Sequence, residues 1–537
     1  MPEILDPTRL FNRGRRVLAL VTTVLALVCG FLAAPAPAPA LAGAARPVVR
    51  TETGLLKGAE AERVDRFLAV PYAQPPVGEL RWSAPRPARP WTGVRDAAAW
   101  GNPCSTAVST NGPRSETEDC LHLNVFRPAG VKAGQRLPVL FWIHGGGLQN
   151  GSGNQHDGSL IARLENVVVV SINYRLGVFG FLAHPALTRE AGQSGNYGFL
   201  DQQAALRWVH RNIGAFGGDA RQVTIDGESA GGFSVCAHLT APGSRGLFNG
   251  AIIQSGSCTT QSVSQGEQSG MSIATQLGCA DDATAVACLR ALTPARLVDG
   301  PQFSSFVSGG PVLPESPNDA VRAGHFQRVP LIVGSTRDEG RTFAQGNLGW
   351  TEAQYQGFVR ALYGANADAV LGRYPWPAES DRFTGAYLTA AILTDSGFIA
   401  GLGGCPTLRF IKDLSAYTRV FAYRFDHRTG PGLSPEPAGY EWGAGHAAEL
   451  AYLWPSFDNG TPIAPTFDAA ERRLAADMVH YWGSFTRLGG PRAPFASSWP
   501  DYNRTSHVMS LRAGGRSVMV PAAEMATEHN CDLWNTL

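Results

Sequence analysis

The stretch QVTIDGESAGGFSVCAHL, residues 222–239, combines a short apolar run, a glycine-rich turn and a second apolar run. The first run predicts a strand over 222–225, and the second predicts a helix over 233–239. The turn between them reads G-x-S-x-G, with Ser229 at its centre. A serine on a sharp strand-to-helix turn is held in strained backbone geometry, and only small neighbours let the chain pass so closely. The pattern therefore predicts a nucleophilic serine exposed at the end of a strand.

Apolar runs of strand length recur on both sides of this turn and alternate with segments of helical spacing. The predicted strands lie at 139–145, 166–172, 222–225, 250–254, 329–333 and 419–425, and the predicted helices at 198–217, 233–239 and 467–488. Strands that are apolar throughout are typical of parallel sheets covered on both faces. We therefore expect the α/β class, with a large, mainly parallel sheet between helices. We also expect residues 45–537 to form one large domain with insertions rather than three domains.

Composition excludes several classes of protein. The 537 residues are 44% apolar and only 17% charged, which excludes a disordered, collagen-like or coiled-coil chain. Lys and Arg number 45 against 44 Asp and Glu, giving a formal charge of +1. Because nucleic-acid binders usually carry a basic excess, we expect no nucleic-acid partner.

The first 44 residues have the layout of a secretory signal peptide. Arg13, Arg15 and Arg16 precede an apolar run over 17–34, followed by alternating Pro and Ala and by small residues at 40–44. This order of basic start, apolar middle and small-residue exit is typical of a cleaved signal. We expect a secreted protein without stable membrane insertion after cleavage. An uncleaved anchor is the alternative, and Arg15-Arg16 also weakly resembles a twin-arginine signal.

The cysteines suggest disulfides rather than a metal site. One of the nine cysteines leaves with the signal, and an even number of eight remains in an exported chain without any C-x-x-C pair. The remaining cysteines are Cys104, Cys120, Cys236, Cys258, Cys279, Cys288, Cys405 and Cys531. Short separations make Cys104 with Cys120, and Cys279 with Cys288, the natural local pairs.

A second glycine-rich turn follows the predicted strand at 139–145. It reads His144-Gly145-Gly146-Gly147. Glycines at a strand end leave backbone N–H groups free to approach a ligand, and such groups form an oxyanion hole together with the amide of the residue after the nucleophile. A flexible turn is the alternative interpretation of the glycines alone. We interpret His144 as a structural part of this loop rather than as a catalytic base.

A serine nucleophile needs a base, and the base needs a carboxylate to orient it. The strand predicted at 329–333 leads to two adjacent carboxylates, Asp338 and Glu339, between which the residues alone do not choose. Among the later histidines, His446 lies in a glycine-rich loop that could turn its imidazole into a cleft. We favour it over His427, and we interpret His480, inside a predicted helix, as a surface or packing residue.

Several ordered motifs resemble those of the type-B carboxylesterases, the family of carboxylesterases, fungal lipases and cholinesterases. The similarity covers nearly the whole chain after the signal, from about residue 81 to residue 534. The matching segments are 118–125 (EDCLHLNV), 144–147 (HGGG), 173–175 (NYR), 227–231 (GESAG), 254–256 (QSG), 338–340 (DEG), His446 with 449–450, and 481–485. The resemblance implies the α/β-hydrolase fold and hydrolysis of small-molecule carboxylic esters through an acyl-enzyme, with no cofactor or metal.

The resemblance also implies residue roles. Ser229 would be the nucleophile, His446 the base and Glu339 the acid. The oxyanion hole would consist of the amides of Gly146, Gly147 and Ala230. The family's cysteine pattern implies the pairs Cys104–Cys120, Cys279–Cys288 and Cys405–Cys531, and leaves Cys236 and Cys258 unassigned. Glu118 matches an acidic residue whose expected role is a salt bridge, here with Arg81.

The chain departs from its relatives at some positions. The loop 104–120 contains no aromatic residue that could hold a choline cation, which argues against a cholinesterase. Asp226, three residues before the nucleophile, stands where relatives carry an apolar or small residue. Phe303 and Phe306 fit either an acyl pocket or the core. The alternative functions are a lipase acting on longer-chain esters and a non-catalytic adhesion relative, although such relatives have typically lost a triad residue that this chain retains.

Overall fold

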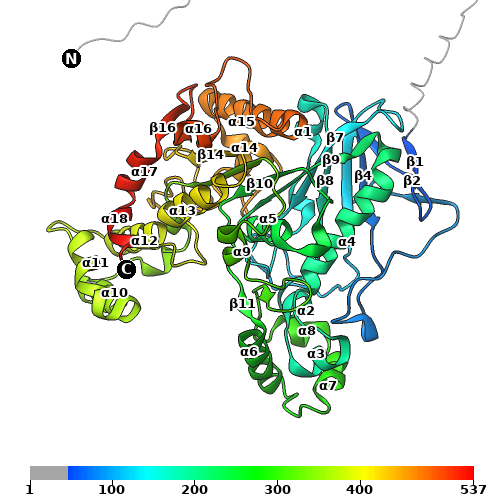
Figure 1. Ribbon diagram of the computed structural model, residues 1–537, viewed down its shortest axis with the longest axis horizontal. Coiled ribbons are helices and arrows are strands. Elements are labelled where there is room, and N and C mark those ends of the chain that lie inside the picture. The colour runs from blue at the N-terminus through cyan, green and yellow to red at the C-terminus, as the bar shows by residue number, and fades with distance from the viewer. Residues whose placement is uncertain (1–45) are drawn as a thin grey trace, which may run out of the picture. The chain divides into compact units, whose positions relative to one another are not determined.

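A large mixed sheet organises the computed structural model, which describes residues 46–537 (Figure 1). From one edge to the other the eleven strands are β16 (Val518–Pro521), β15 (His507–Leu511), β14 (Val420–Phe425), β13 (Leu331–Thr336), β10 (Gly250–Gln254), β9 (Gly218–Glu228), β7 (Leu137–Ile143), β8 (Val168–Ile172), β6 (His122–Pro128), β4 (Val64–Pro71) and β3 (Ala59–Ala61). The seven strands from β15 to β8 run parallel to one another. The expected parallel sheet is therefore present at the centre.

The edges of the sheet differ from the sequence prediction. On one side β6, β4 and β3 continue the sheet in antiparallel pairs, and on the other side β16 pairs antiparallel with β15. None of the five outer strands, β3, β4, β6, β15 and β16, was recognised from the sequence. They are short or carry polar residues, as in 122–128 (HLNVFRP), so their apolar runs are interrupted. Interrupted runs do not stand out from loops by apolar periodicity alone.

Helices bury both faces of the sheet. Along β7 the side chains alternate, so that Phe141 joins one apolar cluster and Trp142 the other. The first cluster is covered by α4 (Tyr197–Asn212), α5 (Ala230–Thr240) and α13 (Gly404–Ser415). The second is covered by α1 (Ser159–Glu165), α14 (Leu450–Leu453) and α15 (Ala469–Leu488). This three-layer arrangement confirms the predicted α/β-hydrolase class (Figure 1).

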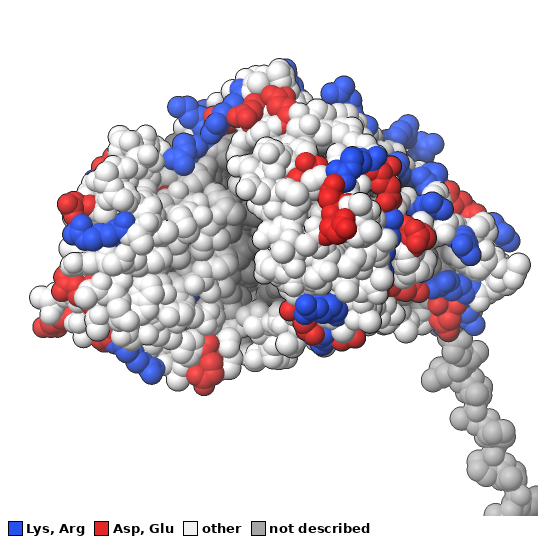
Figure 2. Space-filling view, turned by 90° about the horizontal axis from the view of Figure 1, so that it is seen from below, with Lys and Arg blue, Asp and Glu red and all other residues white. Residues whose placement is uncertain are grey.

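Further helices lie outside these layers, around both ends of the strands. They are α2 (Gly177–Phe181), α3 (Pro185–Ala191), α6 (Val263–Gln276), α7 (Ala285–Ala291), α8 (Pro294–Val298), α9 (Pro317–Ala323), α10 (Glu352–Tyr363), α11 (Ala367–Arg373), α12 (Thr384–Ser396), α16 (Tyr502–Thr505), α17 (Ala522–Glu528) and α18 (Cys531–Trp534). Two small sheets join β1 (Val48–Arg50), β2 (Leu55–Lys57) and β5 (Val94–Asp96), and β11 (Gln261–Ser262) with β12 (Val307–Ser308). One face of the molecule is hollowed by a deep groove whose visible walls carry almost no charged side chains (Figure 2).

All eight cysteines among the described residues lie in pairs at disulfide distance. The Cα–Cα distances are 5.0 Å for Cys104–Cys120, 5.5 Å for Cys236–Cys258, 5.6 Å for Cys279–Cys288 and 5.4 Å for Cys405–Cys531. Three of these are the pairs that the resemblance implies. The fourth, which the sequence left unassigned, fastens α5 to the segment after β10.

Arg81 and Glu118 form the expected salt bridge in a nearly closed environment. The guanidinium Nε donates to Glu118 Oε2 at 2.8 Å, and the two side chains are only 6% and 7% exposed. Arg81 Nη1 also donates to the carbonyl of Leu292 at 2.8 Å. Through these two bonds Arg81 connects loop 104–120 to the end of α7. Removing either partner would leave the other charge buried and unpaired, which is strongly destabilising.

Residues 46–537 form a single compact unit. Within that range, no helix has both the length and the apolar character that a membrane crossing requires. The predicted signal peptide, residues 1–44, lies outside the residues that the structure describes.

Candidate active site

Ser229 occupies a strained position between β9 and α5. Its φ is +55° and its ψ is −122°, a backbone conformation that non-glycine residues rarely adopt. The turn is tight, because a Cβ on Gly231 would overlap the carbonyl of Ile143. The amide of Ser229 donates to the carbonyl of Gln254 at the end of β10, at 2.9 Å. The G-x-S-x-G stretch thus forms the strand–turn–helix element that its sequence predicts.

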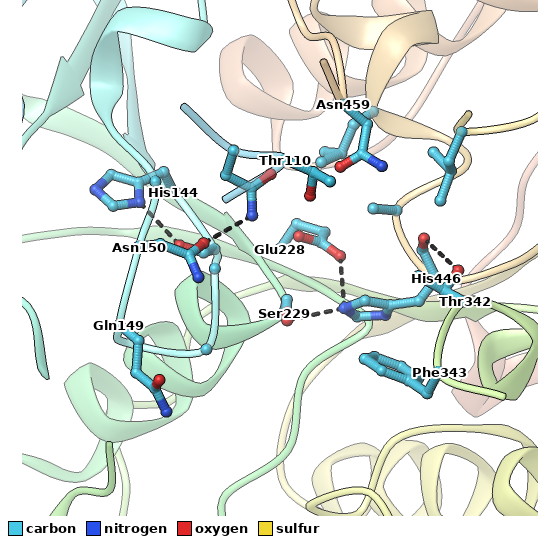
Figure 3. A pocket seen from close by; sticks show the side chains of 18 of the residues that line it. Thr110, His144, Gln149, Asn150, Glu228, Ser229, Thr342, Phe343, His446 and Asn459 are labelled. Carbon is cyan, nitrogen blue, oxygen red and sulfur yellow. Dashed lines mark hydrogen bonds and ion pairs between the residues drawn. The ribbon is translucent and has the colours of Figure 1, made fainter. Parts of the chain in front are cut away.

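Two side chains from distant loops meet Ser229 (Figure 3). The imidazole Nε2 of His446 lies 2.8 Å from Ser229 Oγ, and its Nδ1 lies 2.5 Å from Glu339 Oε2. These groups are separated by more than 100 residues along the chain. The order of hydroxyl, imidazole and carboxylate is the arrangement in which a base activates a serine and a carboxylate orients the base.

Glu339 opens a short 3₁₀ helix, η5 (Glu339–Thr342), directly after β13. Its Oε1 accepts hydrogen bonds from Ser255 Oγ at 2.6 Å and from the amide of Thr336 at 2.9 Å. Burial alone would raise the pKa of Glu339, but the charge and hydrogen bond of His446, with these two donors, hold that pKa below its ordinary value. Glu339 therefore stays a carboxylate facing His446.

Asp338, the other candidate acid, points elsewhere. Its carboxylate accepts two hydrogen bonds from Arg428, at 2.8 and 3.0 Å, and one from the amide of Ala444 at 2.9 Å. None of its hydrogen bonds reaches His446. Of the two adjacent carboxylates, the structure places only Glu339 against the imidazole.

The other candidate histidines are bonded outside this cluster. His427 Nε2 lies 3.1 Å from Glu471 Oε1, and His480 Nδ1 lies 2.5 Å from Glu165 Oε1. His144 stacks on Tyr174 with ring centroids 4.5 Å apart. Burial lowers the pKa of His144 to about 4, so its ring is neutral. These contacts give His144 the structural position expected of it.

The glycine loop lies beside the serine. A Cβ on Gly145 would come within 3.1 Å of Ser229 Cβ. Gly146 and Gly147 have φ values of +94° and +63°, and within residues 46–537 no protein acceptor takes their N–H groups. Ala230 is the first residue of α5, where an amide has no intrahelical acceptor. The amides of the glycine loop and of the start of α5 are thus free of protein acceptors among the described residues.

Two further buried carboxyl groups, Glu228 and Glu449, influence the imidazole, and no role was assigned to them from the sequence. Glu228 Oε1 lies 3.2 Å from His446 Nε2, and both oxygens of Glu449 are buried without a partner among the described residues. Burial raises the pKa of both carboxyls. Glu228 is the second residue of the G-x-S-x-G motif, and Glu449 belongs to the matching segment 449–450. Both motifs were recognised in the sequence, but the contacts of these side chains were not.

Asp226, for which the sequence offered no account, is buried in β9. Its Oδ1 accepts a hydrogen bond from Gln254 Nε2 at 2.9 Å, and its Oδ2 has no partner among the described residues. Burial raises the pKa of Asp226 to about 8, so the group is largely neutral at pH 7.

A cavity of about 660 Å³ opens over Ser229. Its lining includes Glu228, His446, the glycine loop and, from loop 104–120, Thr110 and Asn111. Phe303 and Phe306 are not among the lining residues and are only 4% and 1% exposed, so the structure assigns both to the core. Within residues 46–537, no cluster of three or more His, Cys, Asp or Glu side chains could hold a metal ion.

Residues 45–534 match the carboxylesterase family. The chain belongs to this family. Fumonisin B1 esterase of Sphingopyxis macrogoltabida is 36% identical over 86% of both chains, and human carboxylesterase 3 is 34% identical over 91% of both. A solved structure of a PNB esterase superposes with a TM-score of 0.75 at 32% identity, covering 91% of this chain and all of that one. This carboxylesterase-family member is a serine hydrolase of carboxylic esters, and its substrates are small-molecule esters.

Proposed function

We propose that Ser229, His446 and Glu339 are the catalytic triad of this esterase, with the amides of Gly146, Gly147 and Ala230 as its oxyanion hole. The observation that carries the proposal is the unbroken chain from Ser229 Oγ through the imidazole to Glu339, with contacts of 2.8 and 2.5 Å. The strained backbone of Ser229 supports it, because such strain persists where a function requires it.

In the first half of the reaction, Ser229 Oγ attacks the ester carbonyl while its proton passes to His446 Nε2. The carbonyl π electrons move to oxygen, and the backbone amides stabilise this oxyanion. When the tetrahedral intermediate collapses, the C–O bond to the alcohol breaks. His446 then returns the proton to the leaving oxygen, which leaves an acyl group on Ser229.

The second half repeats these steps with water. His446 takes a proton from the attacking water, and the acyl–serine bond breaks as the proton returns to Ser229 Oγ. Glu339 stabilises the imidazolium formed in each half and fixes its tautomer through Nδ1. Ser255 and Thr336 hold the carboxylate in place.

We also propose that the protein is exported, with residues 1–44 as its signal and 45–537 as one catalytic domain. The four cysteine pairs support this, since disulfides persist in oxidising compartments. The compact unit 46–537 supports the domain boundary. Amino-terminal sequencing of the protein from culture medium tests both points and should begin near residue 43 or 45.

Labelling and substitution together test the triad. An organophosphate should modify Ser229 alone, as mapped by mass spectrometry of peptides. Ser229→Ala should abolish hydrolysis and labelling while circular dichroism stays unchanged, because a small side chain suits the turn. Ser264→Ala, at an exposed serine of α6, is the matched control and should behave as the wild type. An adduct on another serine would refute the assignment.

A further inference from the structure

The cavity over Ser229 is lined by uncharged groups outside the reacting cluster. Its ionisable lining residues are Glu228 and three histidines, with no Lys, Arg or Asp. His144 and His156 are neutral, because burial lowers their pKa values to about 4 and 3. Glu228 and His446 face each other. The lining therefore offers no spare counter-ion for an ionised substrate, and burying an unpaired charge is strongly unfavourable.

Part of the polar lining of the cavity consists of carboxamide side chains, including those of Asn111 and Asn150. Asn111 and Asn150 are both half-buried, and Asn111 Nδ2 donates to Asn150 Oδ1 at 2.8 Å. This bond leaves Asn111 Oδ1 and Asn150 Nδ2 without a protein partner among residues 46–537. One acceptor and one donor are thus held in a fixed relation at the cavity wall.

This carboxamide pair, Asn111 with Asn150, lies next to the glycine loop. The amide of Asn150 donates to the carbonyl of Gly146 at 3.0 Å, and a Cβ on Gly146 would come within 2.5 Å of Asn150 Oδ1. An ester whose carbonyl rests on the amides of this loop therefore has part of its body within reach of the pair.

Other parts of the wall are apolar. Phe233, Phe343, Leu402, Leu433 and Trp442 line the cavity. Figure 3 shows Phe343 beyond His446, on the side away from Asn150. A cavity of this size can hold a small-molecule ester, because clefts of about 300–1,000 Å³ bury most of such a ligand.

We propose that this site selects neutral esters of which one half is apolar and the other carries hydroxyl or carbonyl groups, with the Asn111–Asn150 pair binding the polar half. A hydroxyl can donate to Asn111 Oδ1 and accept from Asn150 Nδ2, and a carbonyl can accept from Nδ2. An alkyl group would displace their water without replacing its hydrogen bonds. The proposal rests on the esterase function proposed above and names its substrate class.

Three esters with one carbon skeleton test the selection. They are propyl butanoate, 2,3-dihydroxypropyl butanoate and propyl 3-hydroxybutanoate, which place no hydroxyl, hydroxyls on the alcohol, or a hydroxyl on the acyl group. Hydrolysis is followed by pH-stat titration, and kcat/KM is compared within each variant so that differences in active fraction cancel. One hydroxylated ester should exceed propyl butanoate by about 10-fold, equivalent to one net hydrogen bond. Which one does so identifies the half that the pair binds.

Asn111→Leu should lower this ratio by about 10-fold, since it removes the free acceptor and the bond that orients Asn150. Gln149→Leu is the matched control, because Gln149 directly precedes Asn150 but its side chain donates to Ser304 at 2.9 Å. Its ratio should equal that of the wild type. Choline butanoate and monopropyl succinate, one cationic and one anionic, should both be poorer substrates than propyl butanoate.

The outcomes separate the two proposals. Any of three results would overturn the substrate class alone. They are equal kcat/KM for the three neutral esters, an equal loss of the hydroxylated-to-plain ratio in both Leu variants, and a preference for an ionised ester. The triad would still stand if Ser229→Ala lost all hydrolysis. Failure of the wild type to hydrolyse any of the esters would overturn the substrate class, and hydrolysis that survives in Ser229→Ala would overturn the triad.

Discussion

Asp338 and Ala444 are joined by two hydrogen bonds. The amide of Asp338 donates to the carbonyl of Ala444 at 2.8 Å, and the amide of Ala444 donates to Asp338 Oδ2 at 2.9 Å. Ala444 lies two residues before His446, so Asp338 anchors the loop that presents the imidazole. Its neighbour Glu339 contacts the imidazole itself. Two adjacent carboxylates therefore hold the same histidine in different ways, one through the backbone and one through the ring.

This difference predicts unequal effects of neutralising the two carboxylates. Glu339→Gln keeps the size of the side chain but removes the charge that fixes the imidazole tautomer, and kcat should fall by about 10⁴-fold. Asp338→Asn should cost far less activity and should lower the melting temperature instead, because it weakens the pairing with Arg428.

The measurement is kcat/KM for both variants on one soluble short-chain ester near pH 8, with thermal unfolding of each. A larger activity loss in Asp338→Asn than in Glu339→Gln would show that the acid has been misassigned.

The sequence predicted those parts of the structure that are determined by residues close together in the chain. The element around Ser229 is one, since its glycines are required by close backbone approach. The choice between Asp338 and Glu339 could not come from the residues alone, because it depends on which way each side chain leaves the turn. The position of Glu228 against His446 is a contact across 218 residues of sequence separation, and no local pattern encodes it. Cys236 and Cys258 stayed unassigned although only 22 residues separate them, because the family's cysteine pattern does not include them.

In the glycine loop, we expect a side chain to be tolerated less well at position 146 than at position 147. Gly146 has a φ of +94°, and a Cβ there would press on the side chain and carbonyl of Asn150. Gly147 also has a positive φ, but nothing lies within 4 Å of the position of its Cβ. Gly146→Ala should displace the loop and lower kcat by about 10²-fold, the cost of losing one oxyanion donor. Gly147→Ala should cost less. Stopped-flow acylation rates would check this, and equal losses would contradict it.

The disulfides predict unequal contributions to stability. Cys405–Cys531 spans 126 residues and Cys279–Cys288 only 9, and a longer closed loop restrains the unfolded chain more. Replacing both cysteines of the longer loop by Ser should lower the free energy of unfolding by about 2–5 kcal/mol, and the shorter loop should cost less. Urea unfolding measures both. Peptide mapping without reduction should recover all four pairs, and a linkage such as Cys120–Cys279 would contradict them.

The contact of Glu228 with His446 should affect how kcat/KM depends on pH. Burial alone would lower the pKa of His446, but the charges of Glu228 and Glu339 outweigh it and raise that pKa to about 9. Because a general base must be unprotonated, kcat/KM of the wild type should rise with pH to about 9. The raised pKa also means that the imidazolium favours folding. This contribution is complete below about pH 6.5 and is lost as pH rises through about 9.

Glu228→Gln removes the charge 3.2 Å from His446 Nε2 and keeps its shape, so the midpoint of the kcat/KM profile should move to lower pH. Glu449→Gln is the matched control. Glu449 also raises the pKa of His446 through its charge, but less than Glu228 and Glu339 do, so the midpoint should move less. Profiles of both variants and the wild type on one neutral ester between pH 6 and 10 measure the shifts. An unmoved midpoint in Glu228→Gln, or a larger shift in Glu449→Gln, would show that Glu228 does not set the basicity of His446.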